Sequence, residues 1–269
     1  MKIINKLAYC LLIVAILLTS CVNNADDLES SLSESTDFSS SKNTPEYISI
    51  SGLNNHPAGS KGFVKVDNGH FYVDGERIRF FGVSIGPDTA FPSKKLAEEI
   101  VSDLAMHGIN AVRLHHMDWP SDGGIFKDFR KDTLALDEEK LDRMDYFIYL
   151  LQKNGIYINF NTHVSRQFAP GDGVEQTEDM HFAGKFINYF DEHVKELHKD
   201  FIKKLYDREN KYTGLRYTQD PGVGMIEITN ENWLFYGWTQ GYLHPKAIDR
   251  TADRATWSMP EYYIKAADK

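Results

Sequence analysis

The sequence predicts an α/β fold in which short strands alternate with amphipathic helices. Runs rich in apolar and β-branched residues recur along the chain, and segments with helical periodicity separate them. Such alternation indicates a parallel sheet. Each run ends in polar residues, which favours a (β/α)8 barrel because these barrels carry their chemistry at the carboxyl ends of their strands. A doubly wound sheet is the alternative, although the sequence GVSIGP at 82–87 is a poor phosphate-binding loop.

A short antiparallel hairpin region is expected before the first parallel strand. An Asn-Gly dipeptide at 68–69 and an Asp-Gly dipeptide at 74–75 are strong tight-turn signals between short alternating runs. The chain after them leads into a strand that ends at Ile85. Further parallel strands are expected at 109–116, 156–163 and 223–230.

Three helices are expected between these strands, each with its own start signal. Ser93, Asp137 and Asp191 stand where helix caps are preferred. The apolar residues at helical spacing are Leu96, Ile100 and Leu104 in the first helix, Leu141, Met144, Ile148 and Leu151 in the second, and Val194, Leu197, Phe201 and Leu205 in the third. These residues are the expected core faces.

The first 20 residues have the pattern of a signal peptide. Lys2 and Lys6 precede an apolar run at 7–18, which is too short for a comfortable membrane span. The run continues into LTSC at 18–21, which resembles a bacterial lipobox. This resemblance implies that Cys21 is the lipidated first residue of the mature protein. An ordinary signal peptide followed by a chance cysteine is the alternative.

Residues 21–45 are rich in serine and acidic residues and predict a disordered tether. A folded domain at 46–269 is expected to follow it. We therefore expect an exported bacterial lipoprotein that is held by its lipid at the outer membrane or cell surface. The net charge of −9 argues against a nucleic-acid partner, since such a partner needs a basic surface.

The polar residues at the predicted strand ends suggest sugar chemistry. Glu231 follows the fourth strand, where a carboxylic acid could protonate the very basic oxygen that leaves when a glycosidic bond breaks. Asn230 precedes it and could hydrogen-bond a sugar hydroxyl. Aromatic residues suited to the apolar faces of sugar rings follow strand ends at Trp119, Trp233, Tyr236 and Trp238.

Strand alternation predicts which of these side chains share a face. Glu227, Thr229 and Glu231 are expected to share one face of the fourth strand, with Glu227 deeper in the barrel than Glu231. At that depth Glu227 is expected to form a structural ion pair with Arg113. His115 and His116 are adjacent, so alternation predicts that only one of them faces inward.

Four segments in chain order resemble the strand motifs of clan A glycoside hydrolases, most closely those of cellulase-like family 5 proteins. They are RFFGVS, NAVRLHHMD, GIYINFNTHVSR and VGMIEITNEN, which together extend over roughly residues 60–240. The resemblance implies a (β/α)8 TIM barrel that hydrolyses O-glycosidic bonds of a β-linked polysaccharide or oligosaccharide with retention and without a cofactor.

The same resemblance assigns roles to the candidate residues. It implies that Glu231 is the catalytic acid/base. The implied substrate-binding residues are Asn230, which contacts the sugar, Arg113, which orients the nucleophile, and His163 with one of His115 and His116, which line the glycone site. Asn161 and Trp233, also near strand ends, are two further candidates for substrate binding.

Two features depart from the family pattern. Asn232 stands where a proline usually follows the Asn-Glu pair. The nucleophile of the family, a second glutamate at the end of the seventh strand, has no counterpart among the 38 residues that follow Glu231. Because a barrel takes about 250 residues, we expect the chain to hold about the first four βα units, as the N-terminal half of a catalytic barrel.

Two other classes of protein stay open from the residues alone. A glycan-binding lipoprotein without catalysis would use the same polar strand ends. A metal-dependent barrel hydrolase could use His115, His116, Asp118 and His163. Alternation disfavours the metal, since two adjacent histidines on one strand point apart, and we predict no metal site.

Overall fold

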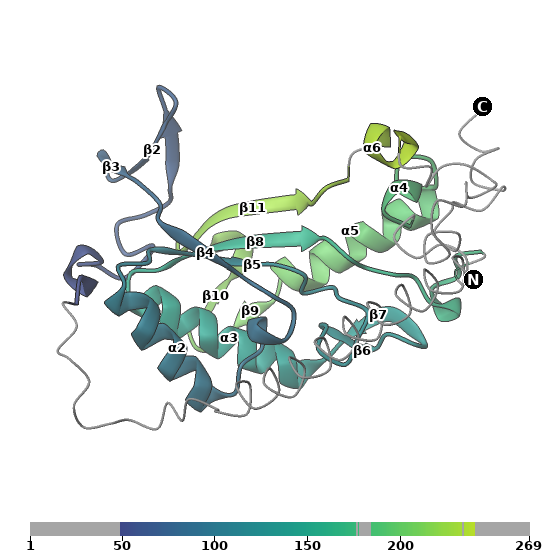
Figure 1. Cartoon of the computed structure of the whole chain (residues 1–269), viewed down its shortest axis with the longest axis horizontal. Helices are drawn as coiled ribbons and strands as arrows, with labels where there is room; N and C mark the ends of the chain where they lie inside the picture. Colours follow the sequence, from purple (N-terminus) through teal and green to yellow (C-terminus); the bar gives the residue numbers. More distant parts are fainter. Residues whose placement is uncertain (1–48, 176, 178–183, 233, 240–269) are drawn as a thin grey trace, which may run out of the picture. The chain divides into compact units, whose positions relative to one another are not determined.

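The computed structural model describes residues 49–175, 177, 184–232 and 234–239. Its centre is a four-stranded parallel sheet (Figure 1). The strands lie side by side in the order β4 (Gly82–Ile85), β5 (Ala111–Leu114), β8 (Tyr157–His163) and β11 (Val223–Thr229). The helices that connect them are α2 (Lys94–Met106), α3 (Glu138–Lys153) and α5 (Glu192–Tyr206).

The order of the strands distinguishes the two parallel folds. Neighbours in the sheet are also neighbours along the chain, with a crossover helix between each pair. A doubly wound sheet would reverse its strand order at a switch point, whereas a barrel adds each strand to the same edge. The described sheet is therefore four consecutive βα units of a partial barrel, as the sequence predicts.

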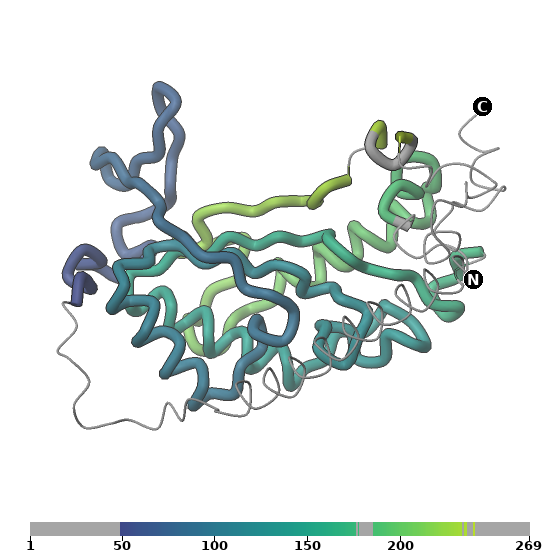
Figure 2. The backbone as a smooth tube through the Cα atoms, viewed as in Figure 1, coloured from purple at the N-terminus to yellow at the C-terminus, as the bar shows by residue number. Residues whose placement is uncertain are grey.

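The hairpin region precedes the sheet as expected. It is a three-stranded antiparallel sheet of β1 (Lys65–Asp67), β2 (His70–Val73) and β3 (Glu76–Ile78). Figure 2 shows it as a separate projection of the backbone. Both turns have positive φ at two successive residues, 47° and 75° at 68–69 and 51° and 78° at 74–75. Asn-Gly and Asp-Gly are the pairs that tolerate this geometry best.

The three expected helix caps are confirmed. The side chain of Ser93 accepts a hydrogen bond from the backbone N–H of Leu96 at 3.3 Å. Asp137 accepts from two backbone N–H groups of the first turn of α3, and Asp191 accepts from Val194 N–H at 3.1 Å. These bonds satisfy N–H groups that a helix start leaves without a partner, so the helices begin where the sequence predicts.

The core lies between the sheet and the helices. All expected core residues of α3 and α5 are buried, and they belong to the hydrophobic clusters of the described residues. In α2 the predicted Ile100 and Leu104 are partly buried and pack against the core, whereas Leu96 is 45% exposed. The fully packed face is shifted by one residue and carries Ala97, Val101 and Ala105.

Several short elements were not predicted. They are the hairpin β6 (Phe126–Asp128) and β7 (Asp132–Leu136), the pair β9 (Glu209–Asn210) and β10 (Leu215–Arg216), the helices α4 (Gly184–Ile187) and α6 (Leu234–Thr239), and the single turns η1 (Ser51–Leu53), η2 (Asp88–Ala90), η3 (Pro170–Asp172) and η6 (Tyr217–Gln219). Elements of this length carry too few residues for a periodic pattern.

The predictions for the N-terminal region lie outside the described residues. This holds for the signal peptide at 1–20 and for the tether at 21–45 with Cys21. Within the part of the chain that the structure describes, no helix has the length and apolar character needed to cross a membrane.

Candidate active site

An arginine–glutamate pair lies on the sheet surface near the carboxyl ends of the strands. Arg113 Nε donates to Glu227 Oε1 and Arg113 Nη2 donates to Glu227 Oε2, each at 2.7 Å. The side-chain amides of Asn159 and Asn161 donate to the same two oxygens at 2.7 and 2.9 Å. Glu227 thus accepts four hydrogen bonds, which together hold it as a carboxylate. The predicted structural pair of Arg113 and Glu227 is confirmed.

Strand register explains this convergence. Arg113 is level with Asn159 across β5 and β8, and Glu227 is level with Asn161 across β8 and β11. Parallel neighbours in register direct their side chains to the same face of a sheet. The amide of Asn159 was not predicted as a site residue, although its shared alternation with Asn161 places it on the same face.

Glu227 should make the stability of the protein depend on acid. The hydrogen bond from Arg113 lowers the pKa of Glu227 below its ordinary value of 4.5, although partial burial raises it. A carboxylate with a lowered pKa stabilises the fold fully above its unfolded pKa and loses this contribution as the pH falls through its folded pKa. We therefore expect the stability difference between wild type and Glu227→Gln to be largest above about pH 4.5 and to shrink below it.

This expectation is measured by urea unfolding of the two proteins from about pH 6 to about pH 3. A difference that stays constant over the whole range would show that the ionised Glu227 contributes nothing. Glu209→Gln, at an exposed glutamate of β9, is the control and should show no such trend.

The pair is joined to two predicted sugar-binding residues. Arg113 Nη2 also donates to Asn230 Oδ1 at 2.9 Å. His115 Nδ1 lies 2.6 Å from Asn161 Oδ1, within hydrogen-bond distance. The structure therefore brings together Arg113, His115, Asn161 and Asn230 through direct contacts. Asn161 is fully buried, so the partly exposed members Arg113, His115 and Asn230 are the ones that suit the recognition of hydroxyl groups.

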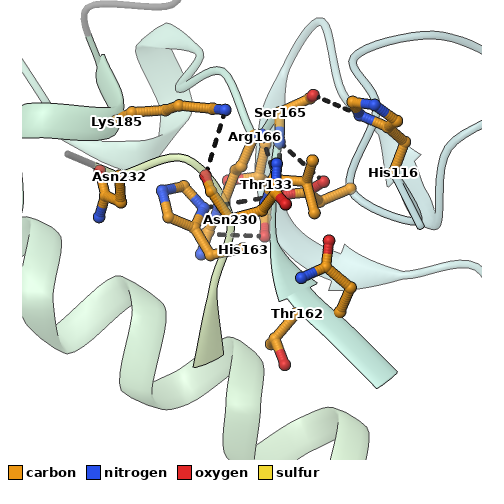
Figure 3. A network of polar contacts seen from close by, with 12 residues as sticks. His116, Thr133, Thr162, His163, Ser165, Arg166, Lys185, Asn230 and Asn232 are labelled. Atoms are coloured by element: carbon orange, nitrogen blue, oxygen red, sulfur yellow. Dashed lines mark hydrogen bonds and ion pairs between the residues drawn. The ribbon is translucent and has the colours of Figure 1, made fainter. Parts of the chain in front are cut away.

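The alternation argument for His115 and His116 was wrong. β5 ends at Leu114, and His116 has a positive φ of 57°, so the chain no longer alternates there. The two imidazole rings lie on the same side, with their centroids 3.8 Å apart. His116 Nδ1 lies 2.7 Å from Ser165 Oγ (Figure 3). The ring of Trp119 meets His116 edge-on at 5.2 Å. Both histidines thus lie at the strand ends.

Glu231 lies just beyond the end of β11 and is exposed. Its φ is +50°, a left-handed conformation that is uncommon for a residue with a side chain. Its position therefore does not follow from strand alternation. The hydrogen bond that Arg113 donates to Glu227 raises the pKa of Arg113, and the charge of Glu231 adds to this effect. Burial lowers the pKa of Lys185, and Glu231 acts in the opposite direction. Glu231 is thus close to two cations.

His163 occupies a different place from the other candidates. The residue is only 2% exposed, and its ring lies against that of His198 on α5, with the centroids 3.9 Å apart. Its Nδ1 lies 3.5 Å from Asp118 Oδ2. Burial lowers the pKa of His163. The structure therefore places His163 inside the packed layer and does not bring it to the open cluster.

Asp118 is a residue whose role sequence reasoning missed, since it was considered only as a metal ligand. It is fully buried. Its carboxylate accepts hydrogen bonds from the backbone N–H groups of Val164 at 2.8 Å, Ser165 at 2.9 Å and Arg166 at 3.0 Å. These three groups form the turn that follows β8. Asp118 therefore shapes the loop that carries Ser165, the partner of His116.

The aromatic candidates near the end of β11 are described only in part. Trp233 lies outside the described residues, as do the side chains of Tyr236 and Trp238. Within the described ranges, no group of three or more His, Cys, Asp or Glu residues is arranged to hold a metal ion.

Known proteins supply an independent comparison. No family model matches the chain. It is 25% identical over 193 residues to mannan endo-1,4-beta-mannosidase 5 of Solanum lycopersicum. This alignment covers 66% of this chain and 44% of the relative. It is also 27% identical over 187 residues to mannan endo-1,4-beta-mannosidase 4 of Oryza sativa subsp. japonica. This second alignment covers 63% of this chain and 38% of the relative.

One solved structure shows the fold. The endo-1,4-beta-mannanase from Rhizomucor miehei superimposes with a TM-score of 0.51 at 21% sequence identity, covering 63% of this chain and 48% of that chain. The chain is thus a partial (β/α)8 barrel, and its resemblance to clan A glycoside hydrolases is confirmed. It spans less than half the length of these relatives.

Proposed function

We propose that the protein is a retaining β-glycoside hydrolase in which Glu231 is the acid/base. The observation that carries this proposal is the position of Glu231 directly after β11, beside the cluster of Arg113, Asn161 and Asn230. An exposed carboxylic acid next to fixed amide and guanidinium donors has the two elements that glycoside cleavage needs. These are a proton source and groups that hold the sugar.

Each group has a defined part in the proposed reaction. Glu231 gives its proton to the leaving glycosidic oxygen as the bond to the anomeric carbon breaks, and a second carboxylate attacks that carbon. Water then attacks the glycosyl–enzyme ester, Glu231 takes a proton from this water, and the second carboxylate leaves. Asn230, held through Oδ1 by Arg113, keeps its amide N–H groups for a sugar hydroxyl.

Glu227 is poorly suited to be the second carboxylate. Both of its oxygens already accept hydrogen bonds from Arg113, Asn159 and Asn161. These bonds make it a weak nucleophile, because attack would give up a fourfold hydrogen-bonded charge. We expect the nucleophile from a part of the barrel outside the described residues.

The proposed substrate is β-1,4-linked mannan. The support is the similarity in sequence to several proteins named mannan endo-1,4-beta-mannosidase. The test is release of reducing ends by the protein, expressed from its own gene, from a panel of mannan, cellulose, xylan and β-1,3-glucan. Activity on mannan that exceeds activity on the other glycans is expected. Binding of glycan without any hydrolysis would instead identify a glycan-binding protein.

We also propose that Cys21 anchors the protein to the membrane by lipid. The lipobox-like residues before it support this proposal. In cells fed radiolabelled palmitate, the wild-type protein should take up label and sediment with membranes, whereas Cys21→Ser should lose both properties. Cys10→Ser, within the expected signal, is the matched control and should keep both. Label uptake by Cys21→Ser would contradict the proposal.

A further inference from the structure

A short segment of the long loop after β8 touches the backbone on both sides of Glu231. Lys185 on α4 donates from Nζ to the carbonyl oxygen of Asn230 at 3.4 Å, a contact that Figure 3 shows. Tyr189 donates from its hydroxyl to the carbonyl oxygen of Asn232. In Figures 1 and 2, α4 lies at the end of the sheet toward which β8 and β11 point. The residues before and after Glu231 therefore each have a carbonyl oxygen that accepts from a side chain of this segment.

A third contact secures the same stretch of chain. Asn232 Nδ2 donates to the side-chain oxygen of Asn188 at 3.4 Å. On the other side, Asn230 N–H donates to the carbonyl oxygen of His163 at 2.8 Å. The backbone from 230 to 232 is thus held from β8 and from the 185–189 segment.

This support matters because Glu231 is in a left-handed conformation, with φ at +50°. A non-glycine residue in this region is disfavoured, and it persists only where surrounding contacts determine it. The contacts of Lys185 and Tyr189 are of that kind, since they hold the carbonyl oxygens of Asn230 and Asn232, the residues on either side of Glu231. They leave the carboxylate itself free of either side chain.

Lys185 is too deeply buried to be an incidental surface residue. It is only 8% exposed, and burial lowers its pKa while the charges of Glu231 and Asp118 act against this. Burying an ammonium group is costly unless nearby anions and acceptors compensate. Here the compensating groups are the Asn230 carbonyl and the two carboxylates, one of which is the proposed acid/base.

We propose that Lys185 and Tyr189 are positioning residues that hold the 230–232 backbone so that Glu231 projects toward the glycosidic oxygen. This inference rests on the proposed function, in which Glu231 is the acid/base. It assigns a positioning role to the 185–189 segment, which carries no recognisable sequence motif.

The variants Lys185→Met and Tyr189→Phe each remove one of the two contacts. Both should lower kcat by roughly 10- to 100-fold with little change in KM, because a misplaced reacting group slows the chemical step without loss of substrate contacts. Lys185→Arg keeps a donor for the Asn230 carbonyl and should restore most of kcat.

Two matched controls test whether the effects are local. Lys199→Met removes an exposed lysine that pairs with Glu196, and Tyr149→Phe removes a hydroxyl on α3 far along the chain from this segment. Neither should change kcat. A wild-type kcat in both Lys185→Met and Tyr189→Phe would overturn the inference.

A second measurement does not depend on activity. Amide hydrogen exchange at residues 230–232 should be faster in both variants than in wild type, at an unchanged thermal midpoint. Unchanged exchange there would also overturn the inference. If the wild-type protein hydrolyses no β-glycan, the proposed function fails, and the exchange data alone then decide whether Lys185 and Tyr189 hold this backbone.

Discussion

Glu231→Gln should reduce kcat/KM for mannan by about 10²- to 10⁴-fold, the usual contribution of general acid–base catalysis. The amide has nearly the shape of the acid but has no proton to give to the leaving oxygen. Glu231 is exposed, so the variant should fold with a stability within about 0.5 kcal/mol of wild type. The measurement is steady-state hydrolysis of mannan, paired with urea unfolding of both proteins.

The matched control for this variant is Glu209→Gln, which removes an exposed carboxylate from β9. It should hydrolyse mannan at the wild-type rate. The loss in Glu231→Gln should also become much smaller with aryl glycosides, because an aryl oxide leaves without protonation. Near-normal hydrolysis of mannan by Glu231→Gln would contradict the assignment of Glu231.

Asp118→Ala should be the most destabilising single change in the described part of the chain among those considered, by about 3–5 kcal/mol. The substitution leaves three buried backbone N–H groups of the turn at 164–166 without an acceptor. It also removes the carboxylate beside the buried ring of His163. The measurement is the free energy of unfolding from urea titration.

Two comparisons make this stability prediction specific. Asp118→Asn keeps one acceptor oxygen and should lose less stability than Asp118→Ala. Asp128→Ala, at an exposed aspartate of β6, should change stability by no more than about 0.5 kcal/mol. A loss in Asp118→Ala no greater than that in Asp128→Ala would show that the buried carboxylate does not hold the turn.

The parts of the fold that follow from local chemistry were predictable. Ser93, Asp137 and Asp191 mark helix starts because their side chains bond the first-turn N–H groups, a property of the sequence alone. Tertiary packing decided the rotation of α2, in which Ala97, Val101 and Ala105 are buried while Ile100 and Leu104 lie at the border of the core. A periodic pattern identifies a helix more securely than it identifies which of two adjacent residues faces the core.

In the candidate site, the regular strands were predictable and the irregular backbone was not. The pairing of Arg113 with Glu227 followed from strand alternation, because both residues lie within regular strands. Alternation failed at His116 and Glu231, where positive φ values end the regular geometry. No local sequence pattern predicts a positive φ at a histidine or a glutamate. Lys185 was missed for a related reason, since its burial depends on how α4 packs beside the residues that follow β11.

Chemical rescue tests the central claim, that Glu231 is the acid/base, most directly. Glu231→Ala, assayed with an aryl β-mannoside and sodium azide, should form the glycosyl–enzyme without an acid. Azide should then release it, because an anionic nucleophile needs no general base. The account predicts a rate that rises with azide and a β-mannosyl azide product, with retained configuration. An α-mannosyl azide product, or no rescue by azide, would contradict it.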